Sequence, residues 1–174
     1  MKKLLIVYYS WSCGNTERIA NALREATGAD IFRIETVTPY EGTYDEVVEQ
    51  GKREVEEDYE PEVKPCPYDL SAYDVIAVGT PTWWYTMAPA VRTFLTSHDL
   101  SGKTVIPFMT NGGWEGHVIK DLKKLAKGAD TVAEFCVRFD SEGGSHMETP
   151  EKTVTAWTEK VKAILMRKTK ENKD

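Results

Sequence analysis

The chain of 174 residues has the size of one ordinary domain, and 41% of its residues are hydrophobic, which is enough to form a core of its own. Its 28 acidic residues against 22 lysines and arginines give a net charge of −6, which argues against a nucleic-acid partner. No apolar stretch is long enough to cross a bilayer, and Cys13, Cys66 and Cys136 are too few and too widely spaced to indicate a disulfide framework or a zinc site.

The N-terminal residues have the charge pattern of a secretory signal. Lys2 and Lys3 precede an apolar run, LLIVYY, at 4–9. This run is shorter than the hydrophobic part of a usual signal sequence, and it leads into SWSCGNT rather than into a small-residue cleavage site. We therefore interpret 4–9 as the first β-strand, and we expect a cytoplasmic protein that does not bind a membrane.

Short apolar runs recur along the chain and predict buried β-strands. Most of them are rich in β-branched or aromatic residues, as strands that are covered on both faces usually are. The five runs are 4–9, 30–35, 75–79, 104–109 and 132–137.

Amphipathic patterns follow these runs and predict helices. In each pattern the apolar residues recur at the helical period and share one face. Gly28 would end the first helix, and Pro89 would begin the third. The five patterns span 19–26, 44–55, 89–95, 118–125 and 154–165.

The alternation of strands and helices predicts a doubly wound α/β domain. Right-handed crossovers would make the five-stranded sheet parallel and place helices on both of its faces. We assign 1–166 to this single domain and 167–174 to a polar C-terminal tail. Because ligands bind beyond the carboxyl ends of such strands, we expect the functional residues in the loops after the first, third and fourth strands.

The loop after the first strand has the features of a phosphate site. Residues 10–16, SWSCGNT, lead directly into a helix, whose first backbone N–H groups lack partners and favour an anion. The glycine allows the backbone to close around an oxyanion without a clash. The loop residues that we assign to phosphate binding are Ser10, Ser12, Cys13, Gly14, Asn15 and Thr16.

Other phosphate-binding patterns match this loop less well. A nucleoside triphosphatase loop needs a lysine, and none lies in 10–27; a dinucleotide fingerprint needs three spaced glycines, and only Gly14 is present. A cysteine-dependent phosphatase needs a thiolate and an arginine, and Cys13 and Arg18 are one residue closer together than that pattern requires. Such a phosphatase, with Asp140 as an acid, stays open as an alternative.

Two further loops are rich in aromatic residues and glycine. The segment 80–89 reads TPTWWYTMAP, and its adjacent aromatic side chains suit a planar ring, an aromatic plug or a partner-binding patch. The segment 110–116 reads TNGGWEG, which suits either close backbone approach to a ring or a simple tight turn. The residues that we assign to ring binding are Pro81, Thr82, Trp83, Trp84, Tyr85, Asn111, Gly112, Gly113, Trp114 and Gly116.

These three loops resemble those of flavodoxins. The segment YYSWSCGNTERIA at 8–20 is similar to the phosphate loop of the flavodoxin-like family, with one residue more before GNT than many members have. PTWWYTMAP and TNGGWEG are similar to the two loops that embrace the flavin in short-chain members. The resemblance covers roughly 3–165, and it implies a sheet of order 2-1-3-4-5 with FMN as the cofactor.

The resemblance implies a carrier that passes electrons through non-covalently bound FMN to redox partner proteins. An FMN-dependent NAD(P)H quinone or nitro-compound reductase of the same fold, acting on a small-molecule acceptor as a monomer or a homodimer, is the second interpretation. A cofactor-free interaction module and the phosphatase are the remaining ones. Since the reactive atoms would belong to the flavin, we assign no catalytic residue.

Three other features receive no role in the site. His98, His117 and His146 lack the spacing of metal ligands, so we assign no metal, and His117 is interpreted as a surface residue at a helix start. The acidic segment 41–62 is interpreted as a solvated helix face, with docking of a basic redox partner as the alternative. The segment 141–147 is interpreted as a loop.

Overall fold

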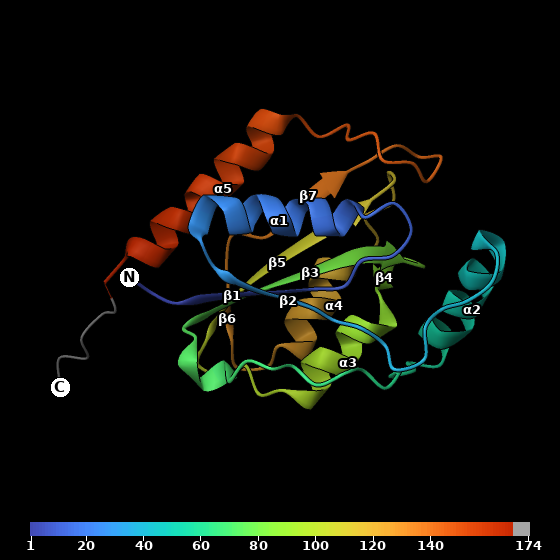
Figure 1. Cartoon of the computed structure of the whole chain (residues 1–174), viewed down its shortest axis with the longest axis horizontal. Coiled ribbons are helices and arrows are strands. Elements are labelled where there is room, and N and C mark those ends of the chain that lie inside the picture. Colours follow the sequence, from blue (N-terminus) through green and yellow to red (C-terminus); the bar gives the residue numbers. More distant parts are fainter. Residues whose placement is uncertain (169–174) are drawn as a thin grey trace.

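The centre of the fold is a parallel β-sheet, which a computed structural model describes together with the rest of residues 1–168 (Figure 1). The order is β2-β1-β3-β5, and β6 and β7 both pair with β5 at the far edge. The bounds are β1 (Leu4–Tyr8), β2 (Asp30–Arg33), β3 (Val75–Trp83), β5 (Thr104–Asn111), β6 (Asp130–Thr131) and β7 (Phe135–Arg138). The predicted doubly wound parallel sheet is confirmed, with the strand positions in the predicted order.

The number of strands differs from the predicted five, because the sheet has seven. One additional strand, β4 (Thr86–Met87), turns back antiparallel to the end of β3. The other arises because the last strand position is divided into β6 and β7, between which Ala133 has a positive φ of 52°. The apolar run at 132–137 therefore contains a bend and is not one continuous strand.

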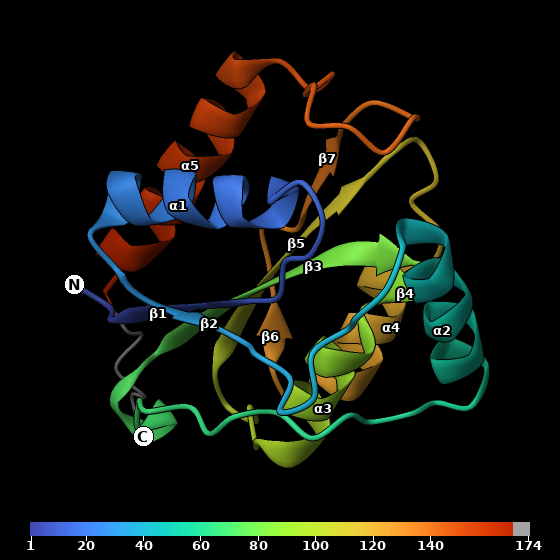
Figure 2. The same cartoon turned by 45° about the vertical axis from the view of Figure 1, so that its right-hand side comes forward.

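Helices cover both faces of the sheet, as predicted. Figure 1 shows α1 and α5 on one face and α3 and α4 on the other. After a turn of the view, α2 is seen to stand beyond the carboxyl ends of the strands (Figure 2). The bounds are α1 (Asn15–Thr27), α2 (Tyr44–Glu56), α3 (Pro89–Ser97), α4 (Val118–Leu125) and α5 (Glu151–Met166), with a 3₁₀ turn, η1, at Leu70–Ala72.

The helix ends follow local backbone chemistry. α1 ends at Gly28, which adopts a left-handed φ of 68° and donates its N–H to the carbonyl of Arg24. α3 begins at Pro89, where the missing N–H costs nothing. Both predicted boundaries are confirmed. α5 ends at Met166, and residues 169–174 of the predicted polar tail lie outside the described residues.

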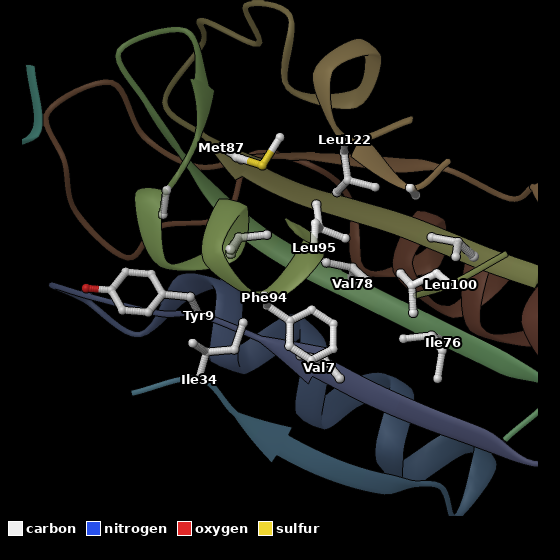
Figure 3. Packing of buried hydrophobic residues seen from close by; sticks show 14 of the residues in the cluster. Val7, Tyr9, Ile34, Ile76, Val78, Met87, Phe94, Leu95, Leu100 and Leu122 are labelled. Carbon is white, nitrogen blue, oxygen red and sulfur yellow. The ribbon is translucent and has the colours of Figure 1, made fainter. Parts of the chain in front are cut away.

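The core consists of one hydrophobic cluster on each face of the sheet. Along β1, alternate residues point to opposite faces, so Leu5 and Val7 join one cluster while Leu4 and Ile6 join the other. In Figure 3, Phe94 of α3 packs over the β1 and β3 side chains of the first cluster. Burying each such side chain contributes about 1.5–3 kcal/mol, and the sheet thereby becomes a rigid base for the loops at its carboxyl edge.

The part of the chain that the structure describes contains no helix long and apolar enough to span a membrane.

Candidate functional site

A cavity of about 620 Å³ opens at the carboxyl edge of the sheet, between the strand ends and α2. Most of the predicted site residues line it: Ser12, Cys13, Asn15, Thr16, Pro81, Thr82, Trp83, Trp84, Tyr85, Asn111, Gly112 and Trp114. The structure therefore brings the three predicted loops together. Four predicted residues, all within the described part of the chain, are not part of this lining: Ser10, Gly14, Gly113 and Gly116.

The loops are shorter than predicted, because two strands run further into them. β3 continues past Gly79 to Trp83, since Thr80 and Pro81 still pair with β5 and Thr82 and Trp83 pair with β4. β5 likewise continues to Asn111. Several side chains of the cavity therefore stand on strands, which hold them more firmly than a free loop would.

One end of the cavity is polar and lies at the N-terminus of α1. Ser12 and Gly14 both adopt left-handed φ values, 64° and 72°, so the chain curls around the start of the helix. The Ser10 hydroxyl accepts a hydrogen bond from the N–H of Glu17 at 3.3 Å, so it supports the loop from behind. Thr16 and Thr110 share a buried hydroxyl–hydroxyl hydrogen bond of 2.8 Å that joins α1 to β5. This end is a rigid, anion-favouring concavity.

The segment after β7 completes the polar end. The carboxylate of Asp140 accepts hydrogen bonds from the N–H groups of Glu142, Gly144 and His146. The loop is also joined to the α1 end, since Asn15 Nδ2 donates to the Gly144 carbonyl at 3.0 Å and the Cys13 thiol donates to the Gly143 carbonyl at 3.2 Å. Residues Phe139 to Gly144 line the cavity. These residues were not assigned to the site from the sequence.

These bonds make a prediction about Asp140. The Gly144 N–H is the main cause that lowers the pKa of this carboxyl, with the His146 and Glu142 N–H groups adding to it. The order of the loop should be complete above the ordinary aspartate pKa and lost as the pH falls through the lowered one. Asp140→Ala should therefore raise the hydrogen-exchange rate of the amides in 142–146 by about tenfold or more near neutral pH.

Asp69→Ala is the matched control, because Asp69 organises a remote exposed turn through Ser71 in the same way. It should leave exchange in 142–146 unchanged. Equal exchange in the wild type and Asp140→Ala would mean that the carboxylate does not order the loop.

The other end of the cavity is aromatic and is built around Trp83. Its ring meets the rings of Tyr40, Tyr9 and Trp11 edge-on, at centroid distances of 5.0, 5.9 and 6.1 Å. Trp11 in turn stacks on Tyr44 of α2 at 5.8 Å. Such edge-to-face packing fixes the ring orientations, so the end opposite the polar concavity is a preorganised apolar wall.

A strained hairpin forms the rim beside this wall. Trp84 and Tyr85, between the paired residues Trp83 and Thr86, both have left-handed φ values, 48° and 69°. Tight hairpins usually place asparagine or glycine at such positions. The Trp84 indole N–H donates to the Val48 carbonyl at 2.8 Å, and a Cβ on Gly116 would lie 2.2 Å from the Tyr85 carbonyl oxygen. Gly116 thus makes room for the hairpin and does not line the cavity.

α2 forms a wall that the sequence did not assign to the site. The residues on the predicted inner face of this helix, Tyr44, Val47, Val48 and Gly51, line the cavity. A Cβ on Gly51 would lie 3.1 Å from the Trp83 ring, so this glycine allows the helix to approach the tryptophan closely. The sequence signal for this close approach was Gly51 itself, a glycine on the apolar face of a predicted helix. Trp11 was also missed, although it lies inside the predicted phosphate loop.

Of the residues of the phosphatase alternative, Cys13 and Asp140 line the cavity, but Arg18 is engaged elsewhere. The Arg18 guanidinium pairs with Glu151 of α5 and lies over the Phe139 ring, and within the described chain it is not part of the cavity lining. His117 precedes the first residue of α4, is exposed and pairs with Asp121, and it lines a separate cavity of about 280 Å³. The position predicted for His117 at a helix start is thus confirmed.

Comparisons with known proteins agree with this geometry. A family model described as Flavodoxin matches residues 3–161. A structure of a protein from Bacteroides eggerthii that is classed as a flavoprotein is 28% identical, covers 97% of this chain and 100% of its own, and has a TM-score of 0.75. A flavoprotein from Lactobacillus acidophilus, solved in complex with FMN, is 23% identical, with coverages of 82% and 96% and a TM-score of 0.67, which shows a shared fold.

A curated relative from Chromohalobacter salexigens is named NAD(P)H dehydrogenase (quinone). It is 38% identical over 100 residues, which are 54% of this chain and 46% of the relative. The match therefore spans about half of the length of each protein.

Proposed function

Because this chain belongs to the flavodoxin family, whose model matches most of its length, we propose that it binds FMN non-covalently in the cavity at the carboxyl edge of the sheet and transfers electrons through it. One observation carries the proposal: a single cavity joins an anion-favouring helix N-terminus to a wall of aromatic rings. FMN has the matching parts, since its phosphate is an anion and its ring is planar.

The residues of the polar end are suited to the phosphate. They carry no positive charge, so binding depends on N–H and hydroxyl donors of 10–16 at the start of α1. The loop that Asp140 organises holds Asn15 and Cys13 in place from the other side. The role of the protein at this end is to fix the phosphate and thereby the position of the ring.

The aromatic end is suited to the ring. Bound flavin supplies the redox chemistry, because its ring accepts and releases electrons. Trp83 and Trp11 offer apolar surface that removes the ring from water, and Asn111 and Gly112 at the end of β5 line the same space. Such contacts orient the ring and leave an edge free for exchange of electrons.

Reduction of a quinone with NAD(P)H is the second candidate function. The named relative supports it, and so does the rim, where Tyr85 and Trp114 are 53% and 60% exposed and could contact a planar acceptor. If the chain is such a reductase, the FMN-loaded protein should oxidise NADH or NADPH steadily when a quinone is present. A carrier should show no such turnover until a separate reductase is added.

Comparison of FMN with riboflavin, which lacks the phosphate, tests the proposed orientation. Hydrogen bonds to a charged group contribute about 1.5–3 kcal/mol each, so FMN should bind roughly a hundredfold or more tightly than riboflavin. Quenching of flavin fluorescence on titration with the protein measures both affinities. Equal affinities would exclude the α1 end as the phosphate site.

A further inference from the structure

A carboxyl group is buried behind the aromatic wall of the cavity. Glu54, in the last turns of α2, is only 8% exposed. Its Oε1 accepts a hydrogen bond from the Tyr40 hydroxyl at 2.9 Å. Its Oε2 has no hydrogen-bond partner among residues 1–168. Burial raises the pKa of this carboxyl, and the nearby Gln50 amide offsets that increase only in part. A buried carboxylate of this kind is costly, so it calls for a physical explanation.

Support of Tyr40 alone does not explain the charge. The hydroxyl needs only an acceptor, and the amide oxygen of a glutamine in the same position would serve. A glutamine would also avoid the cost of burying an ionised group. The feature that distinguishes glutamate here is therefore its charge and its ability to lose or gain a proton.

Two side chains, Tyr40 and Trp83, lie between the carboxyl and the cavity. The Tyr40 ring, to which Glu54 is bonded, packs edge-on against Trp83 at a centroid distance of 5.0 Å, and Trp83 lines the cavity. Two electrons and one proton convert oxidised flavin into a reduced ring that carries one additional negative charge. A nearby carboxylate repels that charge more than it affects the neutral oxidised ring.

We propose that the charge of Glu54 sets the relative affinity of the cavity for oxidised and reduced flavin, an inference that rests on the proposed function. The ionised carboxylate disfavours reduced flavin. When Glu54 is protonated, this penalty is absent. Electron transfer through the bound flavin is thereby coupled to a proton on the protein, at a residue outside the lining of the cavity.

The sign of the pH dependence follows from the surroundings of Glu54. Burial is the main cause that raises its pKa, whereas the Tyr40 hydroxyl, Gln50 and Arg53 act in the opposite direction. The other groups that face this region are Tyr9 at the end of β1, Tyr59 and Asp58 after α2, His117, Asp121 and Lys124 of the α4 segment, and Arg92 of α3, which pairs with Asp58 at 3.6 Å. The penalty on reduced flavin should be present above the raised pKa of Glu54 and disappear as the pH falls through it.

Glu54→Gln in the full chain tests the proposal, with the affinities for oxidised FMN and for anaerobically reduced FMN as the readout. At an effective dielectric constant of about 20, a unit charge about 10 Å away changes an equilibrium roughly tenfold. At about pH 8.5 the variant should therefore bind reduced FMN roughly tenfold more tightly than the wild type does, with the affinity for oxidised FMN unchanged within about twofold. This difference should vanish at low pH, which a purely structural role of Glu54 would not produce.

Glu56→Gln is the matched control, because it removes one charge from the exposed face of the same helix. It should leave the ratio of the two affinities unchanged. An unchanged ratio in Glu54→Gln, or the same change in both variants, would overturn the proposal. If neither the wild type nor the variants bind FMN, the proposed function itself fails, and the two failures are thus distinguishable.

The carboxyl ¹³C resonance of Glu54 in the wild-type protein provides a second test that needs no variant. By linkage, the pKa of Glu54 should be about one unit higher with reduced FMN bound than with oxidised FMN bound, which equals the tenfold ratio. An identical pKa in the two states would also overturn the proposal.

Discussion

Replacing Trp83 with alanine is expected to weaken FMN binding by roughly a hundredfold. Trp83 is the centre of the aromatic wall, because Tyr9, Trp11 and Tyr40 all pack against its ring and Gly51 of α2 lies directly beside it. Its loss removes surface that would cover the flavin and also releases the neighbouring rings from their orientations. Burial of a large apolar surface contributes about 1.5–3 kcal/mol and a favourable aromatic pair about 0.5–1.5 kcal/mol more, which corresponds to roughly a hundredfold in affinity. Titration of FMN fluorescence measures the change.

Trp114→Ala is the matched control for this prediction. Trp114 lines the same cavity but is 60% exposed at the rim, so its loss should weaken FMN binding by less than about tenfold. If Trp114→Ala weakens binding more than Trp83→Ala does, the ring binds at the rim and the proposed position behind it is wrong.

Replacing Gly79 with alanine is expected to lower the free energy of unfolding by about 3 kcal/mol, near the upper end for overpacked sites. Gly79 lies in β3 between Tyr8 of β1 and Phe108 of β5, at the centre of the sheet. A Cβ at this position would lie 2.2 Å from the Phe108 ring, and the ring is fully buried against Trp157. The clash can therefore be relieved only by a shift of the strands. Urea unfolding followed by circular dichroism measures the loss.

A second substitution identifies the cause of this loss. Phe108→Leu removes the atoms that the new Cβ would meet, so Gly79→Ala should cost much less in the Phe108→Leu background than in the wild type. Additive losses from the two substitutions would mean that Gly79 is required for a reason other than the contact with Phe108.

The helices and the positions of the strands along the chain could be predicted because they depend on local patterns, whereas the strand order was implied by the resemblance to the flavodoxin-like family. The predicted apolar faces contain the large apolar residues that α1, α3 and α5 bury, among them Ile19, Phe94 and Trp157. Gly28 and Pro89 mark helix ends for reasons of backbone geometry. These signals lie within a few residues of the structure that they determine, so a single sequence is sufficient to read them.

The position of α2 could not be predicted, because it depends on contacts between distant segments. Its inner face was identified correctly, but such a face is expected to lie on the sheet. In the structure it faces the cavity, where Gly51 lies against Trp83 and Val48 accepts the hydrogen bond of Trp84. Gly51 on this face indicates that another residue approaches the helix closely, but it does not indicate which of the two surfaces the helix covers.

The loop after β7 was not predicted to line the site for a similar reason. Its glycines and serines identify a loop, but its place beside α1 results from hydrogen bonds between Gly143 and Gly144 and residues about 130 positions earlier. The strained hairpin at Trp84 and Tyr85 could not be predicted either, because its sequence lacks the asparagine and glycine that usually mark such turns.

Titration of the purified chain with FMN, followed by visible absorption and flavin fluorescence, tests the central claim most directly. We predict saturable binding of one FMN per chain, with a shifted absorption band and quenched fluorescence, because the ring would enter an aromatic cavity that removes it from water. Free-flavin spectra throughout the titration would contradict the account, since the cavity between α1, the β3–β4 hairpin and α2 would then have to serve another ligand.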